Sequence, residues 1–436
     1  MTTAAKLTVV VEGTGDFDAL MARLRRRGET DLERVEPAVR AILADVRSEG
    51  DRALARAVER FENRKPERFL VKDYGGKEAL ASLPEPLRAS LVLAAERIRR
   101  FHERQREGLF GFAYDEDGVS LATRVEPLAR VGVYAPGGKA RYPSSVLMSA
   151  IPAAVAGVRE IVVASPDTSA EVRAACHLAG VSSLLDAGGA QAIAALAYGT
   201  ESVPRVDKIV GPGNIYVAAA KRLVFGEVGI DSIAGPSEIL VVADDTADAA
   251  VVAADLLSQA EHDEAAYPLL VTTSRELVAR VQSELDEQLR VLPRRAIADA
   301  SVAGQGAALV VLSRDALARV TNELAPEHVA VQTRDPRELV GAIRAAGAIF
   351  VGNQTPEAAG DYLAGPSHVL PTGGAARYAS PLGVYDFVMR TSIIEYTADA
   401  LGAQGAAIAT FARAEGLEAH ARAVEVRVND RRGRAR

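Results

Sequence analysis

From about residue 126 the chain alternates short β-prone runs with alanine-rich helical segments, and this alternation constrains the fold most. The predicted strands of a first series are ARVGVYAP, EIVVAS, SSLLDAG and VDKIVG. The helices between and after them are SSVLMSAIPAAVAGV, SAEVRAACHLAG, AQAIAALAYG and NIYVAAAKRLVF. A second series follows with the strands SEILVVAD, PLLVTT, ALVVLS, HVAVQT and AIFVG. Because parallel strands need such crossovers, the sequence predicts an α/β fold with two doubly wound, incomplete Rossmann-like domains.

The same pattern predicts five parts of the chain. These are an N-terminal arm over 1–30, a helical part over 31–125 that packs with the second α/β domain, the first α/β domain over 126–235, the second over 236–381, and a helical tail over 382–436. After about residue 382 we expect no further strands but two amphipathic helices. A chain of 436 residues is too long for one hydrophobic core, which agrees with several domains.

Composition limits the functional classes. The net charge of -7 gives no reason to expect nucleic acid as a partner. No run of 18 apolar residues occurs, so no membrane span is expected. The single cysteine, Cys176, excludes an intrachain disulfide, and we interpret it as structural. With an N-terminus that resembles neither a secretory signal nor a transit peptide, these features predict a cytoplasmic protein.

Histidines are scarce, so the neighbours of each are informative. The six are His102, His177, His262, His328, His368 and His420. His262 lies three residues after Gln259 in a helical segment, which places both on one face, where they could bind one ion. The local pattern alone favours a capping or solvated histidine over a metal ligand.

Two other segments combine an acid with a histidine. Glu327 and His328 come before the strand HVAV, where an acid–imidazole pair suits proton transfer in alcohol oxidation, and a surface pair is an equally good interpretation. Asp361 and His368 lie in the glycine-rich segment 352–372 that follows a predicted strand, which slightly favours a functional role. His420 shares a helix face with apolar neighbours, so its local pattern predicts a buried core histidine.

The signal for a nucleotide is indirect. The G-x-G-x-x-G fingerprint is absent. The motif GPGN over 211–214 ends a strand and opens a helix, which predicts Asn214 and free N–H groups at a positive helix end. The pair Gly188–Gly189, followed by Gln191, and the motif VYAPGG over 133–138 repeat the arrangement. Three such loops predict a crevice for a phosphate-bearing ligand.

Taken together, the motifs closely resemble those of the histidinol dehydrogenase family. In chain order they are VGVYAPGG, DAGGAQAIAALAYGT, KIVGPGNIYV, IDSIAGPSEILVVAD, LLSQAEHD, LAPEHV, TPEAAGDYLAGPSHVLPTGGAAR, SPLGVYDF and AEGLEAH. The resemblance covers residues from about 125 to 427. The N-terminal quarter is similar only in general character.

The resemblance implies a site for one zinc ion, NAD and L-histidinol in each subunit of a homodimer. The implied zinc ligands are Gln259, His262, Asp361 and His420, with the last supplied by the other subunit. The implied acid–base residues are Glu327 and His328, and the implied NAD contacts are Tyr134, Gln191 and Asn214. The implied substrate contacts are Ser237, Gln259, His262, His328, Asp361, His368, Glu415 and His420.

The implied reaction is the four-electron oxidation of L-histidinol to L-histidine through the aldehyde, the last step of histidine biosynthesis. One alternative is a related zinc and NAD dehydrogenase that oxidises another primary alcohol. Such an enzyme would change the substrate contacts, whereas Ser237, His368 and Glu415 fit the histidinol pattern. A second alternative is a zinc protein without redox activity, either a binding module or a hydrolase. Tyr134, Gln191 and Asn214 argue against it.

Overall fold

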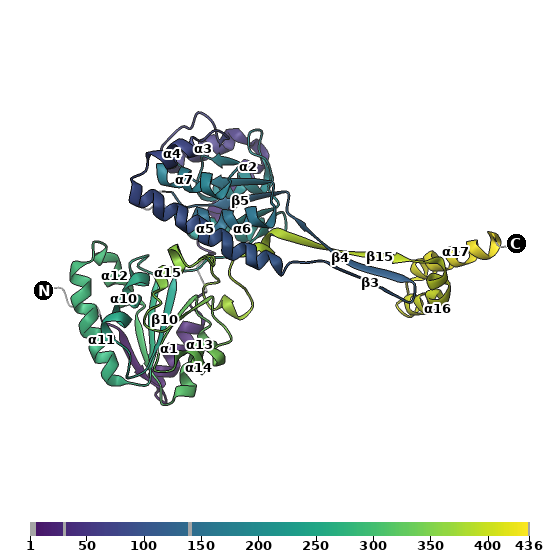
Figure 1. Ribbon diagram of the computed structural model, residues 1–436. Helices are drawn as coiled ribbons and strands as arrows, with labels where there is room; N and C mark the ends of the chain where they lie inside the picture. Colours follow the sequence, from purple (N-terminus) through teal and green to yellow (C-terminus); the bar gives the residue numbers. More distant parts are fainter. Residues whose placement is uncertain (1–5, 29–31, 138–141, 435–436) are drawn as a thin grey trace. The chain divides into compact units, whose positions relative to one another are not determined.

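The structure, a computed structural model, describes residues 6–28, 32–137 and 142–434, with side chains up to residue 429. It forms two compact units (Figure 1). Unit 1 comprises Met1–Arg106 and Leu128–Phe387, and unit 2 comprises the two segments 107–127 and 388–436. Of the expected N-terminal arm, residues 1–5 and 29–30 lie outside the described part.

The first sheet in unit 1 has the strand order β2-β7-β6-β5-β8-β9. Its strands are β2 (Leu70–Val71), β5 (Arg130–Tyr134), β6 (Glu160–Ala164), β7 (Ser183–Leu185), β8 (Lys208–Val210) and β9 (Gly229–Ile230). All neighbours are parallel except β2, which pairs antiparallel with β7. The crossover helices are α6 (Pro143–Ala156), α7 (Ala170–Ala179), α8 (Gly189–Tyr198) and α9 (Ile215–Val224). The first series of predicted strands and helices is therefore confirmed.

The N-terminal helices correct one expectation. They are α2 (Glu36–Glu49), α3 (Asp51–Glu62), α4 (Gly76–Ser82) and α5 (Glu85–Glu107). We expected residues 31–125 to pack with the second α/β domain, but α2 packs on α8 and α9, α3 on α8, and α4 on α7. The apolar stripe of α2, with Val39, Leu43 and Val46 buried, belongs to the same core as α8. Burial of each such side chain contributes about 1.5–3 kcal/mol, and this packing determines the location of these helices.

The second sheet has the strand order β1-β12-β11-β10-β13-β14 and is parallel throughout. Its strands are β1 (Thr8–Val11), β10 (Glu238–Ala243), β11 (Tyr267–Thr272), β12 (Ala307–Val310), β13 (His328–Gln332) and β14 (Ala348–Val351). The predicted strands of the second series are all present. Residues 8–11 of the expected arm are instead an edge strand, because Val10 and Leu7 are buried beside this sheet.

Helices cover both faces of the second sheet. They are α1 (Gly15–Arg25), α10 (Ala249–Ala260), α11 (Arg275–Gln288), α12 (Arg295–Gly304), α13 (Arg314–Leu324), α14 (Pro336–Ala342) and α15 (Glu357–Tyr362), with short 3-10 turns at Leu289–Val291, Ala375–Arg377 and Val384–Phe387. One core contains residues of α10, α11 and α12, and the other contains residues of α1, α13 and α14. Numbered along the chain from β5 and from β10, the five successive strands of each domain have the same spatial order, 3-2-1-4-5.

Unit 2 contains strands where we expected only helices. It comprises β3 (Phe112–Glu116), β4 (Val119–Pro127), β15 (Val388–Tyr396), α16 (Ala398–Ala414) and α17 (Glu418–Arg434). Asp117 and Gly118 have φ angles of 50° and 77°, so they form the two-residue turn that favours a β-hairpin. The expectation that strands end near residue 382 is also wrong, because β15 pairs with β4 along its whole length. The two predicted tail helices are confirmed as α16 and α17.

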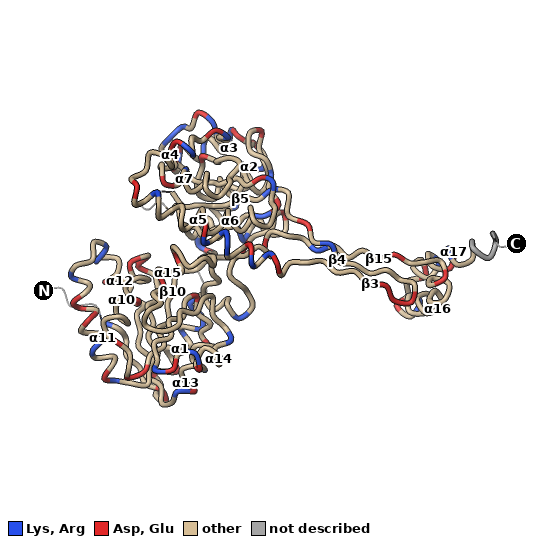
Figure 2. Tube along the Cα trace, in the orientation of Figure 1, with Lys and Arg blue, Asp and Glu red and all other residues tan. Residues whose placement is uncertain are grey.

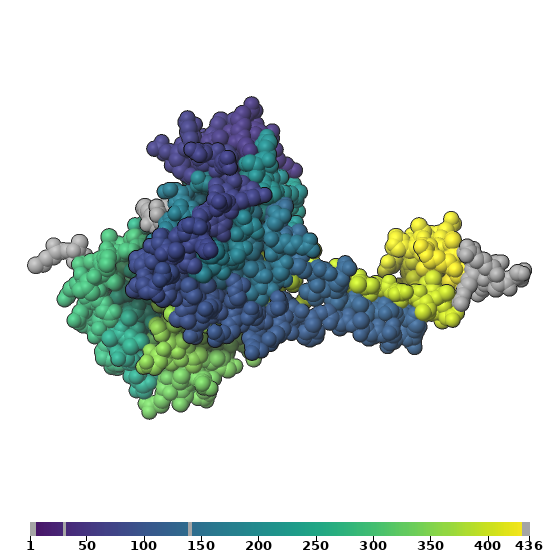
Figure 3. All heavy atoms as spheres, turned by 45° about the horizontal axis from the view of Figure 1, so that its top comes forward, coloured from purple at the N-terminus to yellow at the C-terminus, as the bar shows by residue number. Residues whose placement is uncertain are grey.

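The three strands of unit 2 form a ribbon in the order β15-β4-β3. Figure 3 shows how narrow this ribbon is, and residues 389–396 of β15 are all exposed. The helix pair begins at the turn end of the ribbon, where Thr397 N donates to Gly118 O at 3.0 Å. Gly405 of α16 faces Val424 and Val428 of α17, and this small residue allows the two helices to pack closely.

Surface charge is mixed. Figure 2 shows Lys and Arg interspersed with Asp and Glu along the helices of both α/β domains. Within the described ranges, no helix combines the length and apolar character that crossing a membrane requires.

Candidate functional site

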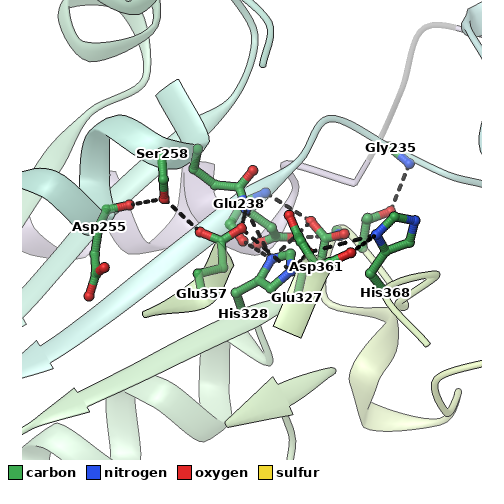
Figure 4. Close-up of polar contacts among 12 residues, drawn as sticks. Gly235, Glu238, Asp255, Ser258, Glu327, His328, Glu357, Asp361 and His368 are labelled. Carbon is green, nitrogen blue, oxygen red and sulfur yellow. Dashed lines mark hydrogen bonds and ion pairs between the residues drawn. The ribbon is translucent and has the colours of Figure 1, made fainter. Parts of the chain in front are cut away.

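Chain direction brings several predicted site residues to the amino edge of the second sheet. Helix α10 starts after the carboxyl end of β10 and returns toward its amino end, so Gln259 in its last turn and His262 just beyond it reach this edge. His328 is the first residue of β13 and lies beside β10. Helix α15, which follows β14, contributes Asp361. Figure 4 shows His328 and Asp361 converging there with Glu327, Glu357 and His368.

The backbone of Glu238 holds the acid–base pair. Its N–H donates to Glu327 Oε2 at 3.0 Å, and its carbonyl oxygen lies 3.0 Å from His328 Nδ1. Gln259 Nε2 is also 3.1 Å from Nδ1, but this amide already donates to Glu357. Since the Glu238 carbonyl can only accept, we assign a proton to Nδ1. In the neutral ring Nε2 is then the unprotonated nitrogen.

The Nε2 atom of His328 faces a small acidic cluster. It lies 3.7 Å from Glu357 Oε1 and 3.9 Å from Asp361 Oδ1. It is buried and has no hydrogen-bond partner among the described residues. His368 Nδ1 lies 3.2 Å from the Asp361 carbonyl oxygen, so this histidine joins the same group. An unpartnered nitrogen in such a position can accept a proton from a substrate.

Burial is the main cause of the shifted pKa values in the cluster. It lowers the pKa of His328, which keeps the imidazole neutral in neutral solution. Burial and the nearby Glu238 carboxylate raise the pKa of Glu327 well above its usual range. Burial also raises the pKa of Glu357 to about 7 and that of Asp361 to about 6. A bound cation would stabilise the ionised forms of these neighbouring carboxyl groups, so their raised pKa values favour cation binding.

The donor set suits a metal ion. Gln259 is buried and its Oε1 atom has no hydrogen-bond partner in the described chain, while its Nε2 donates to Glu357 at 2.5 Å. The amide oxygen is therefore available to a metal. Gln259, His262 and Asp361 line one cavity of about 360 Å³. Oxygen and imidazole donors of this kind bind zinc.

A second grouping of possible ligands overlaps this one. The ligand atoms of His328, Glu357 and Asp361 all lie within 4.8 Å of one another. Glu357 is already an acceptor for Gln259 Nε2 and for Ser258 Oγ, at 2.5 and 2.9 Å. We therefore interpret Glu357 as the residue that orients Gln259, and Asp361 as the shared member of both groupings.

The same cavity contains the predicted acid–base residues and the other predicted substrate contacts of unit 1. Its lining includes Ser237, Glu327, His328 and His368, and it also includes Pro136 and the loop 211–213 from the first α/β domain. The cavity therefore combines the carboxyl edge of the first sheet with the amino edge of the second.

His420 and Glu415 belong to unit 2 and are not part of this cavity. Both side chains are exposed. The expectation from the local pattern that His420 is a buried core residue is wrong. Its neighbour Leu417 on the same face is itself 42% exposed, so the described residues of unit 2 leave both side chains open to solvent.

The predicted nucleotide contacts line a separate cavity of about 860 Å³. Tyr134, Gln191 and Asn214 all border it, together with Gly188 and Gly189. The Tyr134 hydroxyl accepts a hydrogen bond from Gly189 N at 3.0 Å. Gly138, the last residue of the predicted VYAPGG loop, lies outside the described residues.

We expected free N–H groups at the starts of the helices beside this cavity, but side chains accept hydrogen bonds from several of these groups. Asn214 caps α9, and its Oδ1 accepts from Tyr216 N at 3.0 Å and Val217 N at 3.2 Å. At the start of α8, Glu62 Oε1 accepts from Gly188 N and from Gln191 Nε2 at 2.9 and 3.0 Å. Side chains thus satisfy backbone groups that we assigned to a ligand.

Several residues in and around the site were not predicted from the sequence. Glu357 lies four residues before Asp361 on one helix, and this spacing could have indicated it. Glu238 opens a strand that is otherwise apolar and buried, which is an unusual place for a carboxylate. Arg27, just beyond the end of α1, pairs with Glu238, and its position among the arginines of RLRRRG gave no signal.

Comparison with known proteins adds independent information. A family model described as histidinol dehydrogenase matches residues 25–428. A histidinol dehydrogenase of Syntrophotalea carbinolica is 52% identical over 421 residues, which cover 95% of this chain and 97% of that protein. One from Aquifex aeolicus is 49% identical over 409 residues, covering 93% and 96%. The crystal structure of histidinol dehydrogenase from Elizabethkingia anophelis matches with a TM-score of 0.91 at 32% identity, covering 99% of both chains.

Proposed function

The chain belongs to the histidinol dehydrogenase family, and from this membership we propose that it oxidises L-histidinol to L-histidine with zinc and two molecules of NAD. The observation that carries the proposal is the position of the Glu327–His328 pair. The pair borders the cavity that also contains Gln259, His262 and Asp361. One cavity thus supplies both a base and metal donors.

We propose that zinc is held by Gln259, His262 and Asp361 together with His420 of the partner subunit. The unpartnered Gln259 Oε1 supports the first of these assignments. The exposed position of His420 on α17 leaves it free to serve another chain. A bound zinc ion would supply a Lewis-acid anchor for nitrogen donors of the substrate. The chain would then act as a two-fold homodimer with shared sites.

His328 is the base for the alcohol. Its Nε2 atom takes the hydroxyl proton, while Nδ1 stays bonded to the Glu238 carbonyl, which fixes the ring in place. NAD supplies the hydride acceptor for both oxidations, one molecule for each. The alcohol loses a hydride from its carbon to NAD and a proton from its oxygen to His328, and becomes the aldehyde.

Glu327 serves the hydration of the aldehyde. Its raised pKa makes the ionised carboxylate a stronger base, and it removes a proton from the water that adds to the carbonyl carbon. The resulting hydrate loses a second hydride and proton to give the carboxylic acid. Glu327 is 7% exposed and His328 is 4% exposed. An aldehyde bound beside this buried pair has little access to solvent, which limits its escape.

The remaining contacts complete the proposal. Tyr134, Gln191 and Asn214 would hold NAD in the larger cavity. Ser237 and His368 would contact the substrate from the same subunit, with Glu415 supplied by the helical tail. Burial lowers the pKa of His368 to about 4, so it would be a neutral hydrogen-bonding partner.

The test is NADH formation upon addition of L-histidinol to the zinc-loaded protein. We expect two NADH molecules for each histidine produced. NADH formation with another primary alcohol, such as a sulfonated diol, but not with histidinol would favour the related-dehydrogenase alternative. No NADH with any alcohol would favour a protein without redox activity.

A further inference from the structure

The acid–base pair depends on a buried contact with the N-terminal region of the chain. Glu238 binds Glu327 through its N–H and His328 through its carbonyl oxygen, so its position determines theirs. The Glu238 side chain points elsewhere and makes no contact with the substrate cavity. Its Oε2 atom accepts from Arg27 Nε at 2.5 Å, and its Oε1 atom accepts from Gly373 N.

Arg27 connects three elements at once. Besides Glu238 at the start of β10, it donates through Nη1 to Leu24 O in α1 at 2.9 Å. Through Nη2 it donates to Leu324 O at 2.7 Å, at the end of α13 and three residues before Glu327. Both side chains of the ion pair are only 1% exposed. One planar guanidinium thus fixes both chain segments that lead to the acid–base pair.

The residue after Arg27 is also closely packed. A Cβ atom on Gly28 would lie 2.5 Å from Gly373 O, in the segment that donates to the Glu238 carboxylate. The backbone of this region therefore cannot shift without moving the partners of Glu238. A buried ion pair is weak evidence for net stability, and in some proteins such pairs instead specify one conformation.

We propose that Arg27 is a positioning residue for catalysis, which acts through Glu238 on Glu327 and His328. The inference rests on the proposed function, because it takes these two residues as the acid–base pair. Arg27 does not touch the reacting atoms. Its loss should misplace the pair while leaving the zinc donors and the nucleotide cavity in place.

The experiment compares Arg27→Met with the matched control Arg25→Met in the zinc-loaded protein. Arg25 lies on the same helix end and pairs with Glu323 of α13, but its side chain is 49% exposed. We expect the control to keep wild-type kcat. For Arg27→Met we expect kcat to fall about 10- to 100-fold, with zinc content and KM for NAD unchanged, since small misplacements of catalytic groups have effects of this size.

A double-mutant cycle separates positioning from general damage. In a His328→Asn background, adding Arg27→Met should lower the residual kcat by less than about twofold, because oxidation of the alcohol, whose base is already absent, then limits turnover and the position of Glu327 no longer affects kcat. Arg27→Lys covers the case in which Arg27→Met does not fold. A lysine ammonium also has three N–H donors, but all are on one nitrogen, whereas Arg27 donates from three nitrogens of a planar group. The kcat of this variant should therefore also fall, by about 3- to 10-fold.

Three results would overturn the inference. They are wild-type kcat in a folded Arg27→Met or Arg27→Lys protein, a fall in the His328→Asn background as large as in wild type, or loss of zinc in parallel with loss of activity. Failure of the proposed function gives a different result, because the wild-type protein itself would then form no NADH from L-histidinol.

Discussion

Glu357 Oε1 lies 2.5 Å from Gln259 Nε2, and this bond turns the Gln259 amide oxygen toward the cavity. Replacing Glu357 with Leu removes the acceptor, so the amide is free to rotate. We expect zinc affinity to fall about 10- to 100-fold, as for other partners of metal ligands. Competition with a chelator of known affinity measures this. Glu276→Leu, an exposed acid on α11, is the control and should leave zinc affinity unchanged.

Metal removal should abolish activity reversibly. We expect a chelator to stop NADH formation and added zinc to restore it, because Gln259, His262 and Asp361 border the substrate cavity. His262→Asn should lower zinc content, measured by metal analysis, as well as kcat. His177→Asn, remote from these cavities on α7, should change neither. A fully active metal-free preparation would contradict the zinc assignment.

The two half-reactions should respond differently to changes in the acid–base pair. Glu327→Gln removes the base for hydration, so overall oxidation of histidinol should fall far more than reduction of the aldehyde. His328→Asn removes the base for the alcohol and should slow both directions of the first step. Stopped-flow measurement of each partial reaction tests this. Equal losses in every step for both variants would refute the division of roles.

Shared sites predict complementation. Two inactive variants, His328→Ala and His420→Ala, are mixed under conditions that allow subunit exchange. In a mixed dimer one site has both lesions and the other has none. With random exchange half of the dimers are mixed, so activity should recover to about one quarter of wild type. If exchange is confirmed by mass and no activity returns, His420 does not serve the partner subunit.

Asp255 should make stability depend on pH. Burial raises its pKa from 3.8 to about 6, and Gln332 Nε2 donates to it at 2.6 Å. Between these two pH values the folded state binds more protons than the unfolded state, so stability falls as pH rises, and the penalty is complete above pH 6. Asp255→Asn keeps an acceptor for Gln332 but cannot ionise.

We therefore expect the Asp255→Asn variant to be more stable than wild type at neutral pH, by up to about 3 kcal/mol. The difference should shrink as pH falls toward 4, where the wild-type carboxyl group is protonated in the folded state. Melting temperature measured across this range tests it. Equal melting temperatures at neutral pH would show that ionisation of the buried Asp255 carboxyl group does not destabilise the folded state.

Local periodicity predicted the parallel strands because each is a short, buried apolar run, as in β10, and it predicted the crossovers from their alanine-rich faces. It failed for β15, whose exposed residues follow no simple alternation and whose pairing with β4 joins positions far apart in the sequence. The site residues Glu327 and His328 carry chemically distinctive side chains. Arg27 is one of several arginines in RLRRRG, and only its buried contact with Glu238 in the folded chain distinguishes it from the others.

Cys176 is fully buried in α7, and burial raises the pKa of its thiol far above the ordinary value. Since it is the only cysteine in the chain, the native protein presents no readily reactive thiol to solvent. A cysteine introduced at an exposed position such as Tyr378, which is 83% exposed, would be the only site for thiol-specific dyes or spin labels. The wild-type chain is thus already a suitable background for single-site labelling in distance and exchange measurements.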